Sequence, residues 1–177
     1  MRTLLLKNVG CLVSGIINEP YCAGDSIFIK DGLIAAIGDA SPSEEDADLV
    51  IDVQGATVAP GLIDSHVHPV LGDFTPRQNM LGFIESSLHG GVTTMISAGE
   101  AHAPGRPKDP AGAKALAILC HKSSCNHRPA GVKLHGGALI LEKGLQEEDF
   151  AELAAEGVWL VGEVGLGSVK EPEEAAQ

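Results

Sequence analysis

Two histidines separated by one residue, His66 and His68, have the types and spacing best suited to chemistry in this sequence. On a β-strand, residues i and i+2 point to the same face, so the two imidazoles project together, about 6–7 Å apart along the strand. Imidazoles placed in this way can bind one metal ion at roughly 2.0–2.1 Å each. Pro69 follows at once and ends the strand, so we expect the pair at an open strand end. A bare His-x-His also occurs by chance in edge strands, so the surrounding elements decide its meaning.

The segment before the histidines, residues 1–58, is predicted to form short strands. Apolar runs at residues 26–30 and 33–37 flank Asp31-Gly32, a dipeptide typical of hairpin turns because both positions favour positive φ. We predict a second hairpin between residues 49–53 and 56–58, across Gln54-Gly55. The acidic stretch between these hairpins is expected to be an exposed loop.

The pattern changes after Pro60, where predicted strands and helices alternate. Thr75 and Pro76 suit the start of a helix that ends at Gly90-Gly91, and Asp109-Pro110 suits the start of another. A third helix is expected at residues 146–155, with Phe150, Leu153 and Ala154 facing inward. The predicted strands span residues 62–66, 92–97, 131–135 and 158–164. Such alternation is typical of a parallel sheet with helical crossovers, which is an α/β fold.

Composition narrows the functional classes. The chain has 177 residues, of which 44% are hydrophobic and only 3% aromatic, so its core must depend on aliphatic side chains. Its formal net charge of −12 disfavours binding to nucleic acid or to an anionic membrane, and we expect neither as a partner. The four cysteines form no Cys-x-x-Cys pair and are predicted to be free thiols. Lys7 interrupts the first apolar run after three leucines, so we expect no signal peptide and a cytoplasmic protein.

The run PGLIDSHVH at residues 60–68 closely resembles the first-strand motif of the amidohydrolase superfamily. A narrower resemblance, to the enamidase-like members of that superfamily, extends over most of the chain through residues 88–99, 104–109, 128–137 and 161–167. The resemblance implies the N-terminal half of a (β/α)8 TIM-type barrel at residues 59–177. It also implies that residues 1–58 are part of a small β-sandwich domain.

Function and cofactors follow from the same resemblance. It implies a metal-dependent hydrolase of C–N bonds other than peptide bonds, with a small cyclic amide as substrate, such as a nicotinate-derived lactam. It also implies two divalent metal ions, zinc alone or zinc with iron, bridged by a residue at the end of the fourth barrel strand. Glu163 ends the fourth predicted strand, and a carboxylate can offer one oxygen to each of two cations, so we predict that His66, His68 and Glu163 bind metal. Lys133 is the rival bridging residue, although it lies one strand too early.

Other polar residues have two interpretations each. His135 ends the third predicted strand and could orient substrate or form an ordinary hydrogen bond; we predict it as the substrate-binding residue. Asp64 could fix a ligand imidazole or cap the strand. Arg106 and Lys108 could meet a substrate carboxylate, but a solvated loop is the favoured interpretation. The remaining histidines share no spacing and are expected at the surface or at helix ends: His89, His102, His121 and His127.

The predicted site is incomplete within this sequence. A closed barrel of this type takes roughly 250 residues, and the resemblance places the remaining histidine ligands and the catalytic aspartate beyond Gln177. We therefore expect a fragment of an enzyme that forms a homo-oligomer at full length, and we expect the isolated chain to be inactive. Two alternatives stay open: one chain of a split enzyme, or a non-catalytic metal-binding remnant.

Overall fold

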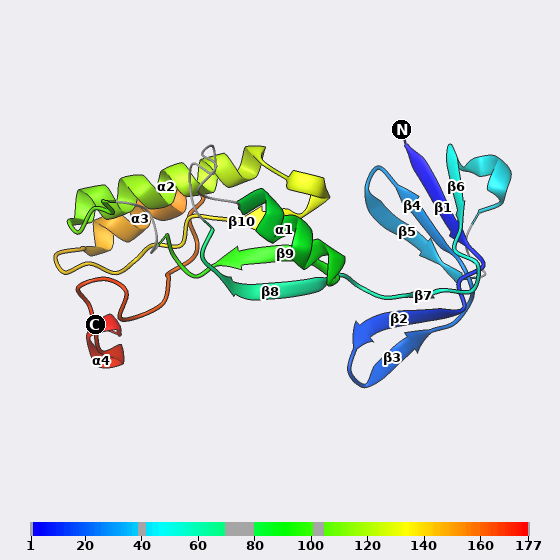
Figure 1. Ribbon diagram of the computed structural model, residues 1–177, viewed down its shortest axis with the longest axis horizontal. Coiled ribbons are helices and arrows are strands. Elements are labelled where there is room, and N and C mark those ends of the chain that lie inside the picture. Colours follow the sequence, from blue (N-terminus) through cyan, green and yellow to red (C-terminus); the bar gives the residue numbers. More distant parts are fainter. Residues whose placement is uncertain (1, 39–41, 70–79, 101–104, 177) are drawn as a thin grey trace. The chain divides into compact units, whose positions relative to one another are not determined.

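The structure is a computed structural model, and it describes residues 2–38, 42–69, 80–100 and 105–176. The chain divides into two compact units, Met1–Pro60 and Gly61–Gln177. In the first unit, the described residues form strands and one short 3-10 helix, whereas the second unit alternates strands with helices (Figure 1). None of the helices in the described part of the chain combines the length and apolar character that crossing a bilayer requires.

The first unit contains two small sheets. One sheet has the order β5-β4-β1-β6, and the other has the order β3-β2-β7. Their strands and the short helix η2 have these bounds: β1 (Thr3–Lys7), β2 (Cys11–Ile16), β3 (Glu19–Cys22), β4 (Ile27–Lys30), β5 (Leu33–Ile37), η2 (Glu44–Asp46), β6 (Leu49–Asp52) and β7 (Thr57–Val58). Side chains from both sheets meet in one core, where Val9, Leu12 and Ile27 are buried.

The two hairpins predicted in this unit have different outcomes. The first is confirmed: β4 and β5 pair antiparallel across Asp31 and Gly32, whose φ angles are 49° and 83°. The second is wrong. Gln54 and Gly55 do form a turn with positive φ, but β6 pairs in parallel with β1 while β7 pairs in parallel with β2. Val53, immediately before that turn, packs into the core between the sheets, so the turn carries the chain from one sheet to the other.

The second unit is built on a three-stranded parallel sheet. Its strands are β8 (Leu62–Val67), β9 (Val92–Ser97) and β10 (Lys133–His135), and β9 lies in the middle. The first two strands agree closely with their predicted bounds, and the parallel pairing with helical crossovers is confirmed. The register of β8 on β9 shifts between Asp64 and Val67, so the strand pairing is irregular in the stretch that contains His66.

Helices α1, α2 and η3 connect these strands, and α3 and α4 follow β10. Their bounds are α1 (Met80–His89), α2 (Pro110–Asn126), η3 (Pro129–Gly131), α3 (Glu147–Ala155) and α4 (Pro172–Ala175). Asp109 caps α2 as predicted, because its side chain accepts a hydrogen bond of 2.9 Å from the amide of Gly112. The predicted start of α1 at Thr75 and Pro76 lies outside the described residues, while Gly91, with φ 92°, ends that helix as expected.

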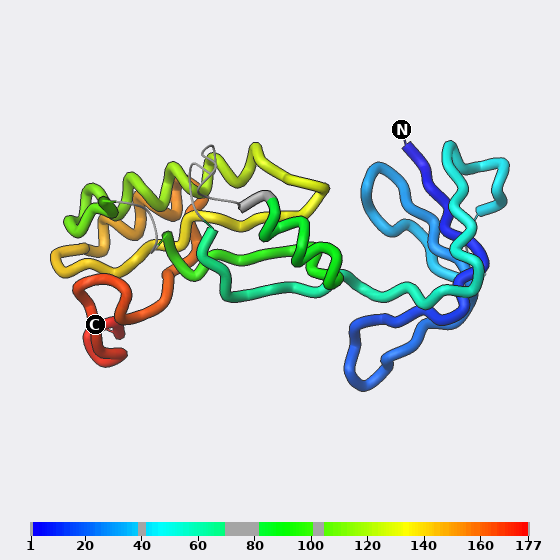
Figure 2. The backbone as a smooth tube through the Cα atoms, viewed as in Figure 1, coloured from blue at the N-terminus to red at the C-terminus, as the bar shows by residue number. Residues whose placement is uncertain are grey.

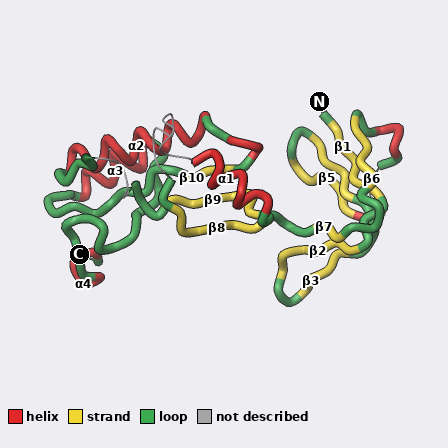
Figure 3. The backbone as a smooth tube through the Cα atoms, in the orientation of Figure 1, coloured by secondary structure: helices red, strands yellow, loops and turns green. Residues whose placement is uncertain are grey.

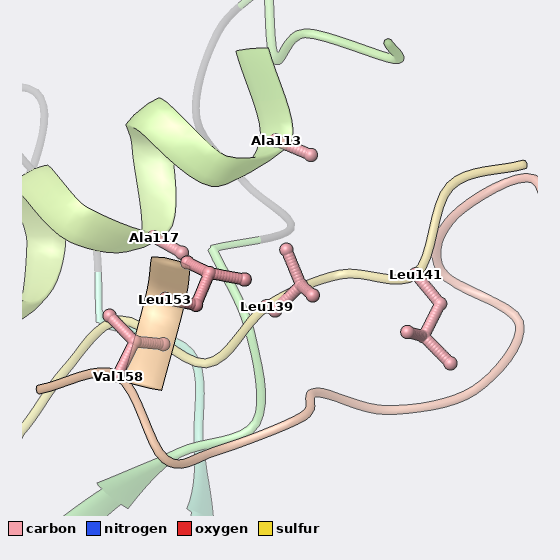
Figure 4. Close-up of a cluster of buried hydrophobic side chains, with 6 residues drawn as sticks. All are labelled: Ala113, Ala117, Leu139, Leu141, Leu153 and Val158. Atoms are coloured by element: carbon pink, nitrogen blue, oxygen red, sulfur yellow. The ribbon is translucent and has the colours of Figure 1, made fainter. Parts of the chain in front are cut away.

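Two apolar clusters hold the second unit together. In the first, α1 covers one face of the sheet through Ile84, which packs with Val67, Met95 and Leu134 from the three strands. The backbone of α2 runs beside that of α3 (Figure 2). The second cluster joins α2, α3 and neighbouring segments through Ala113, Ala117, Leu139, Leu141, Leu153 and Val158 (Figure 4). Leu153 faces inward as predicted and is the buried residue of α3. Phe150, which was also predicted to face inward, is 39% exposed.

The predicted fourth strand at residues 158–164 is wrong as a regular element. This stretch is mostly loop (Figure 3) and forms a single parallel bridge between Val161 and Leu139. The amide of Gly162 donates to the carbonyl of Leu139 at 2.7 Å. Gly137, two residues after the end of β10, has a φ of 89° and turns the chain away from the extended conformation. β10 therefore offers residues 158–164 no continuous edge on which to pair. The architecture is mixed α/β.

Candidate metal centre

His66, His68 and Glu163 come together at one end of the parallel sheet. Nε2 of His66 lies 3.2 Å from Oε2 of Glu163, and Nε2 of His68 lies 3.5 Å from the same oxygen. The two imidazole rings are nearly perpendicular, with centroids 5.2 Å apart. Among the described residues, these three form the one group of His, Cys, Asp or Glu side chains with metal-ligand spacing.

Strand alternation explains the direction of the two histidines. Val67, between them, is buried in the cluster that α1 covers. His66 and His68 therefore project from the opposite face. The carboxylate of Asp64 accepts a hydrogen bond of 3.1 Å from the backbone amide of His66. Of its two interpretations, the structural cap is the one that its contacts match.

His68 is oriented by the segment that follows β9. Its Nδ1 lies 2.8 Å from the carbonyl oxygen of Gly99. A carbonyl can only accept, so Nδ1 carries a proton, and in the neutral ring Nε2, on the side of Glu163, is then the nitrogen with the lone pair. This is the tautomer that a metal ligand requires.

Glu163 reaches the histidines from a loop rather than from a strand end. Its amide donates to the carbonyl of Ala98 at 2.8 Å, which ties this loop to the end of β9. The side chain of Glu163 is 45% exposed and that of His66 is 59% exposed, so the centre opens to solvent.

The donor geometry fits a divalent cation. A tetrahedral ion with ligands at about 2.0–2.1 Å holds neighbouring donor atoms about 3.3 Å apart. The two nitrogen–oxygen distances, 3.2 Å and 3.5 Å, bracket that value. Two neutral imidazoles and one carboxylate are also a donor set that zinc and iron accept. Both short distances involve Oε2 of Glu163, so the other oxygen of this carboxylate lies outside the three-atom group.

Lys133 and His135 are not part of this group. Both lie on β10 and flank the buried Leu134, so they share the face from which His66 projects. Lys133 pairs with Thr94, four positions before Ala98, which places its backbone roughly 13 Å along the strand from the level of Glu163. His135 is exposed as a whole, but its ring is partly shielded from solvent. This partial burial, followed by the nearby charges of Lys133, Arg128 and His121, lowers the pKa of the ring.

Arg106 contradicts the expectation of a solvated loop. Its side chain is only 12% exposed and forms an ion pair of 2.7 Å with Glu142, whose side chain is 1% exposed. It also donates to the carbonyl of Leu166 at 3.1 Å. The sequence hid this role because Glu142 lies 36 residues away. Lys108 is exposed, as predicted.

The remaining described histidines and the cysteines agree with expectation except for His121, which is half-buried within α2 instead of lying at the surface or at a helix end. His89 and His127 are exposed at the ends of α1 and α2, and His121 lies on α2 at 3.7 Å from Sγ of Cys125. His102 lies outside the described residues. All four cysteines are free.

Glu100 is the residue that sequence reasoning missed. It is 3% exposed at the end of the segment after β9. Burial raises the pKa of its carboxyl to about 7, and hydrogen bonds from the amide of Gly137 and from Ser97 and Cys120 offset only part of that effect. The charge of the nearby His68 ring also lowers it. The sequence could have indicated Glu100 through its position three residues after the predicted strand 92–97, because functional groups often lie at the carboxyl ends of parallel strands.

Comparison with known proteins places this geometry in a family. The chain is 60% identical to enamidase from Eubacterium barkeri over 177 residues, which cover 99% of this chain and 46% of the relative. It also matches the crystal structure of enamidase, described as a member of the amidohydrolase superfamily, with a TM-score of 0.90 and 60% identity over 98% of this chain and 46% of that chain. This chain belongs to the amidohydrolase superfamily.

More distant relatives share the superfamily opening. A dihydroorotase from Methanosphaera stadtmanae is 33% identical over 97 residues, which are 54% of this chain and 21% of the relative. No protein-family model matches the chain. The chain spans less than half of the length of each of these relatives, and it corresponds to the N-terminal part of enamidase. The resemblance drawn from the sequence is therefore confirmed.

Proposed function

We propose that the protein containing this chain is a metal-dependent hydrolase of C–N bonds other than peptide bonds. The observation that carries the proposal is the convergence of His66, His68 and Glu163 at 3.2–3.5 Å on the first barrel-type strand and its partner loop. Identity to enamidase over 99% of the chain supports the same activity.

The three side chains would hold the metal through two imidazole nitrogens and one carboxylate. A divalent cation bound there supplies Lewis-acid polarisation of the scissile amide carbonyl. We propose two such ions, zinc alone or zinc with iron, and Glu163 would help to hold both because its carboxylate has two oxygens. The other histidine ligands and the aspartate that handles the proton would come from residues beyond Gln177.

A small cyclic amide is the proposed substrate, in the enamidase-like case a lactam derived from nicotinate. His135 supports this proposal, because it lies on the same face of the sheet as His66 and its lowered pKa favours a neutral ring. A neutral imidazole can donate one hydrogen bond to a substrate carbonyl or accept one from a substrate N–H.

The 177 residues by themselves would not turn over substrate. Leu62, Ile63 and Val161 are 53–64% exposed beside the sheet. Apolar surface of this kind indicates a core that further strands complete. Those strands would come from the rest of the same polypeptide or, in a split enzyme, from another chain; a non-catalytic metal-binding remnant would have no such completion.

Metal analysis and hydrolysis test the function together. The complete protein should bind close to two divalent ions per chain and open the ring of a cyclic enamide. His66→Ala and His68→Ala should each remove metal and activity, whereas His127→Ala, a change at an exposed helix end, should retain both. Wild-type metal content in both ligand variants, measured by elemental analysis, would refute the assignment.

A further inference from the structure

Residues 97–100, which we call the bridging segment, begin with the last residue of β9 and connect the two parts of the candidate centre. The amide of Ala98 donates to the carbonyl of Val67 at 2.8 Å, beside the histidines. The carbonyl of the same residue accepts from the amide of Glu163 at 2.8 Å. One residue therefore joins the strand that carries the imidazoles to the loop that carries the carboxylate.

The next residue of the bridging segment orients an imidazole directly. The carbonyl of Gly99 lies 2.8 Å from Nδ1 of His68. Its φ of 116° is a conformation that glycine adopts easily, and a Cβ there would lie 2.8 Å from Cγ1 of Ile140. The position of this carbonyl is thus set by a tightly packed backbone, and a small displacement would change the direction of the His68 lone pair.

Buried polar contacts hold the bridging segment. Oγ of Ser97 accepts from the amide of Gly99 at 3.0 Å and donates to Oε1 of Glu100 at 3.4 Å. The amide of Gly137 and the thiol of Cys120 also lie beside the carboxylate of Glu100 and lower its pKa. Glu100 therefore links the bridging segment to the turn after β10 and to α2.

The composition of this contact set is informative. Burying a carboxyl costs free energy unless its oxygens receive hydrogen bonds or a cation. Among the described residues, the groups that lower the pKa of Glu100 are the amide of Gly137, the side chains of Ser97 and Cys120, and the His68 ring. Donors from three separate elements fix the position of the carboxylate more closely than a single flexible cation would.

We propose that Glu100 is a positioning residue for the metal centre. It anchors the bridging segment, so that the carbonyl of Gly99 orients His68 and the carbonyl of Ala98 places Glu163. The proposal rests on the proposed function, because it assumes that His68 and Glu163 bind the cation. It assigns Glu100 no contact with substrate or metal.

Metal affinity tests this role in the complete protein. Glu100→Gln keeps the size of the side chain but replaces one accepting oxygen with an NH2 group that donates. This NH2 group would face a donor of the surrounding segments and could not accept a hydrogen bond from it. Ser97→Ala removes the bond to Gly99. Each change should weaken Zn²⁺ binding by about 10- to 100-fold in competition with a chelating indicator, and should alter the visible absorption of the Co²⁺-substituted protein.

Ser124→Ala is the matched control, since Ser124 is also a buried serine of this unit but lies on α2 against Gly136 and not in the bridging segment, so it tests whether loss of any buried serine near the turn after β10 weakens binding. Wild-type affinity in Ser124→Ala with weakened binding in the other two variants supports the proposal. Equal affinity in all variants overturns it, as does equal weakening in all three, which would indicate general destabilisation. His68→Ala separates the two hypotheses: if it retains wild-type affinity, the metal centre itself is wrong.

Discussion

Removing the guanidinium of Arg106 should strongly destabilise the second unit. Nη1 of Arg106 lies 2.7 Å from Oε1 of Glu142, and Nη2 donates to the carbonyl of Leu166 at 3.1 Å. The other oxygen of Glu142 accepts from the amide of Ser168 at 2.8 Å. The pair therefore connects three segments that are separated in the sequence.

The magnitude follows from the burial of both partners. Arg106→Ala would leave the carboxylate of Glu142, 1% exposed, without its cation. Loss of one partner from a buried pair costs about 3–5 kcal/mol, whereas replacing both partners by apolar groups is often nearly neutral. We therefore expect Arg106→Ala to lower the free energy of unfolding by about 3–5 kcal/mol, and Arg106→Met combined with Glu142→Leu to recover most of that loss.

The effect should depend on pH. Burial alone would raise the pKa of Glu142, but hydrogen bonds from Ser168 and Arg106 outweigh it and hold the pKa below its ordinary value of 4.5. A lowered pKa means that the pair contributes stability above pH 4.5 and loses it as the pH falls through the lower, folded-state pKa. The difference between wild type and Arg106→Ala should therefore shrink in acid.

Urea unfolding at neutral and acidic pH measures this difference, and hydrogen exchange at the amide of Ser168 reports the local opening. Lys108→Ala is the control, because Lys108 is an exposed cation on the same loop and its loss should change stability by less than about 0.5 kcal/mol. Equal, small effects of the Arg106 and Lys108 substitutions would refute the buried pair.

Two further predictions concern backbone packing and thiol reactivity. Gly99→Ala should lower the free energy of unfolding by about 1–3 kcal/mol in urea, because the new Cβ would lie 2.8 Å from Cγ1 of Ile140. Gly105→Ala, at a position with positive φ but open space, should lower it less. Equal losses of stability in the two variants would argue against the contact with Ile140. Burial raises the pKa of the Cys120 thiol. A thiol reagent should therefore label the exposed Cys125 in the folded protein and reach Cys120 only after unfolding. Equal labelling rates of the two cysteines before unfolding would contradict the burial of Cys120.

Local structure was predicted well wherever short-range chemistry decides it. Asp31-Gly32 forms the expected hairpin because both residues adopt positive φ. Asp109 caps α2 through the amide three residues ahead. The alternation along β8 also placed His66 and His68 on one face. Glu163 entered only through resemblance to a family, since nothing local indicates that residue 163 meets residue 66.

The failures arise where distant segments choose their partners. The turn at Gln54-Gly55 forms, yet the strands on either side join different sheets, because β1 and β2 each offer an edge. The stretch at residues 158–164 has a strand-like pattern, but Gly137 ends the edge on which it would pair. Pairing partners of this kind depend on the assembled sheet, which no window of sequence contains.

By itself, the sequence determined the class of the chain, its superfamily and the identity of two histidines with metal-ligand spacing, because these depend on periodicity, turn chemistry and a contiguous motif. Only the tertiary structure decided that Glu163 lies within 3.5 Å of both imidazoles, that Arg106 is buried against Glu142, and that Glu100 anchors the segment between the ligands. The physical reason is the same in each case. Burial and hydrogen bonding between residues 36 to 97 positions apart depend on which surfaces pack, and packing is a property of the whole unit.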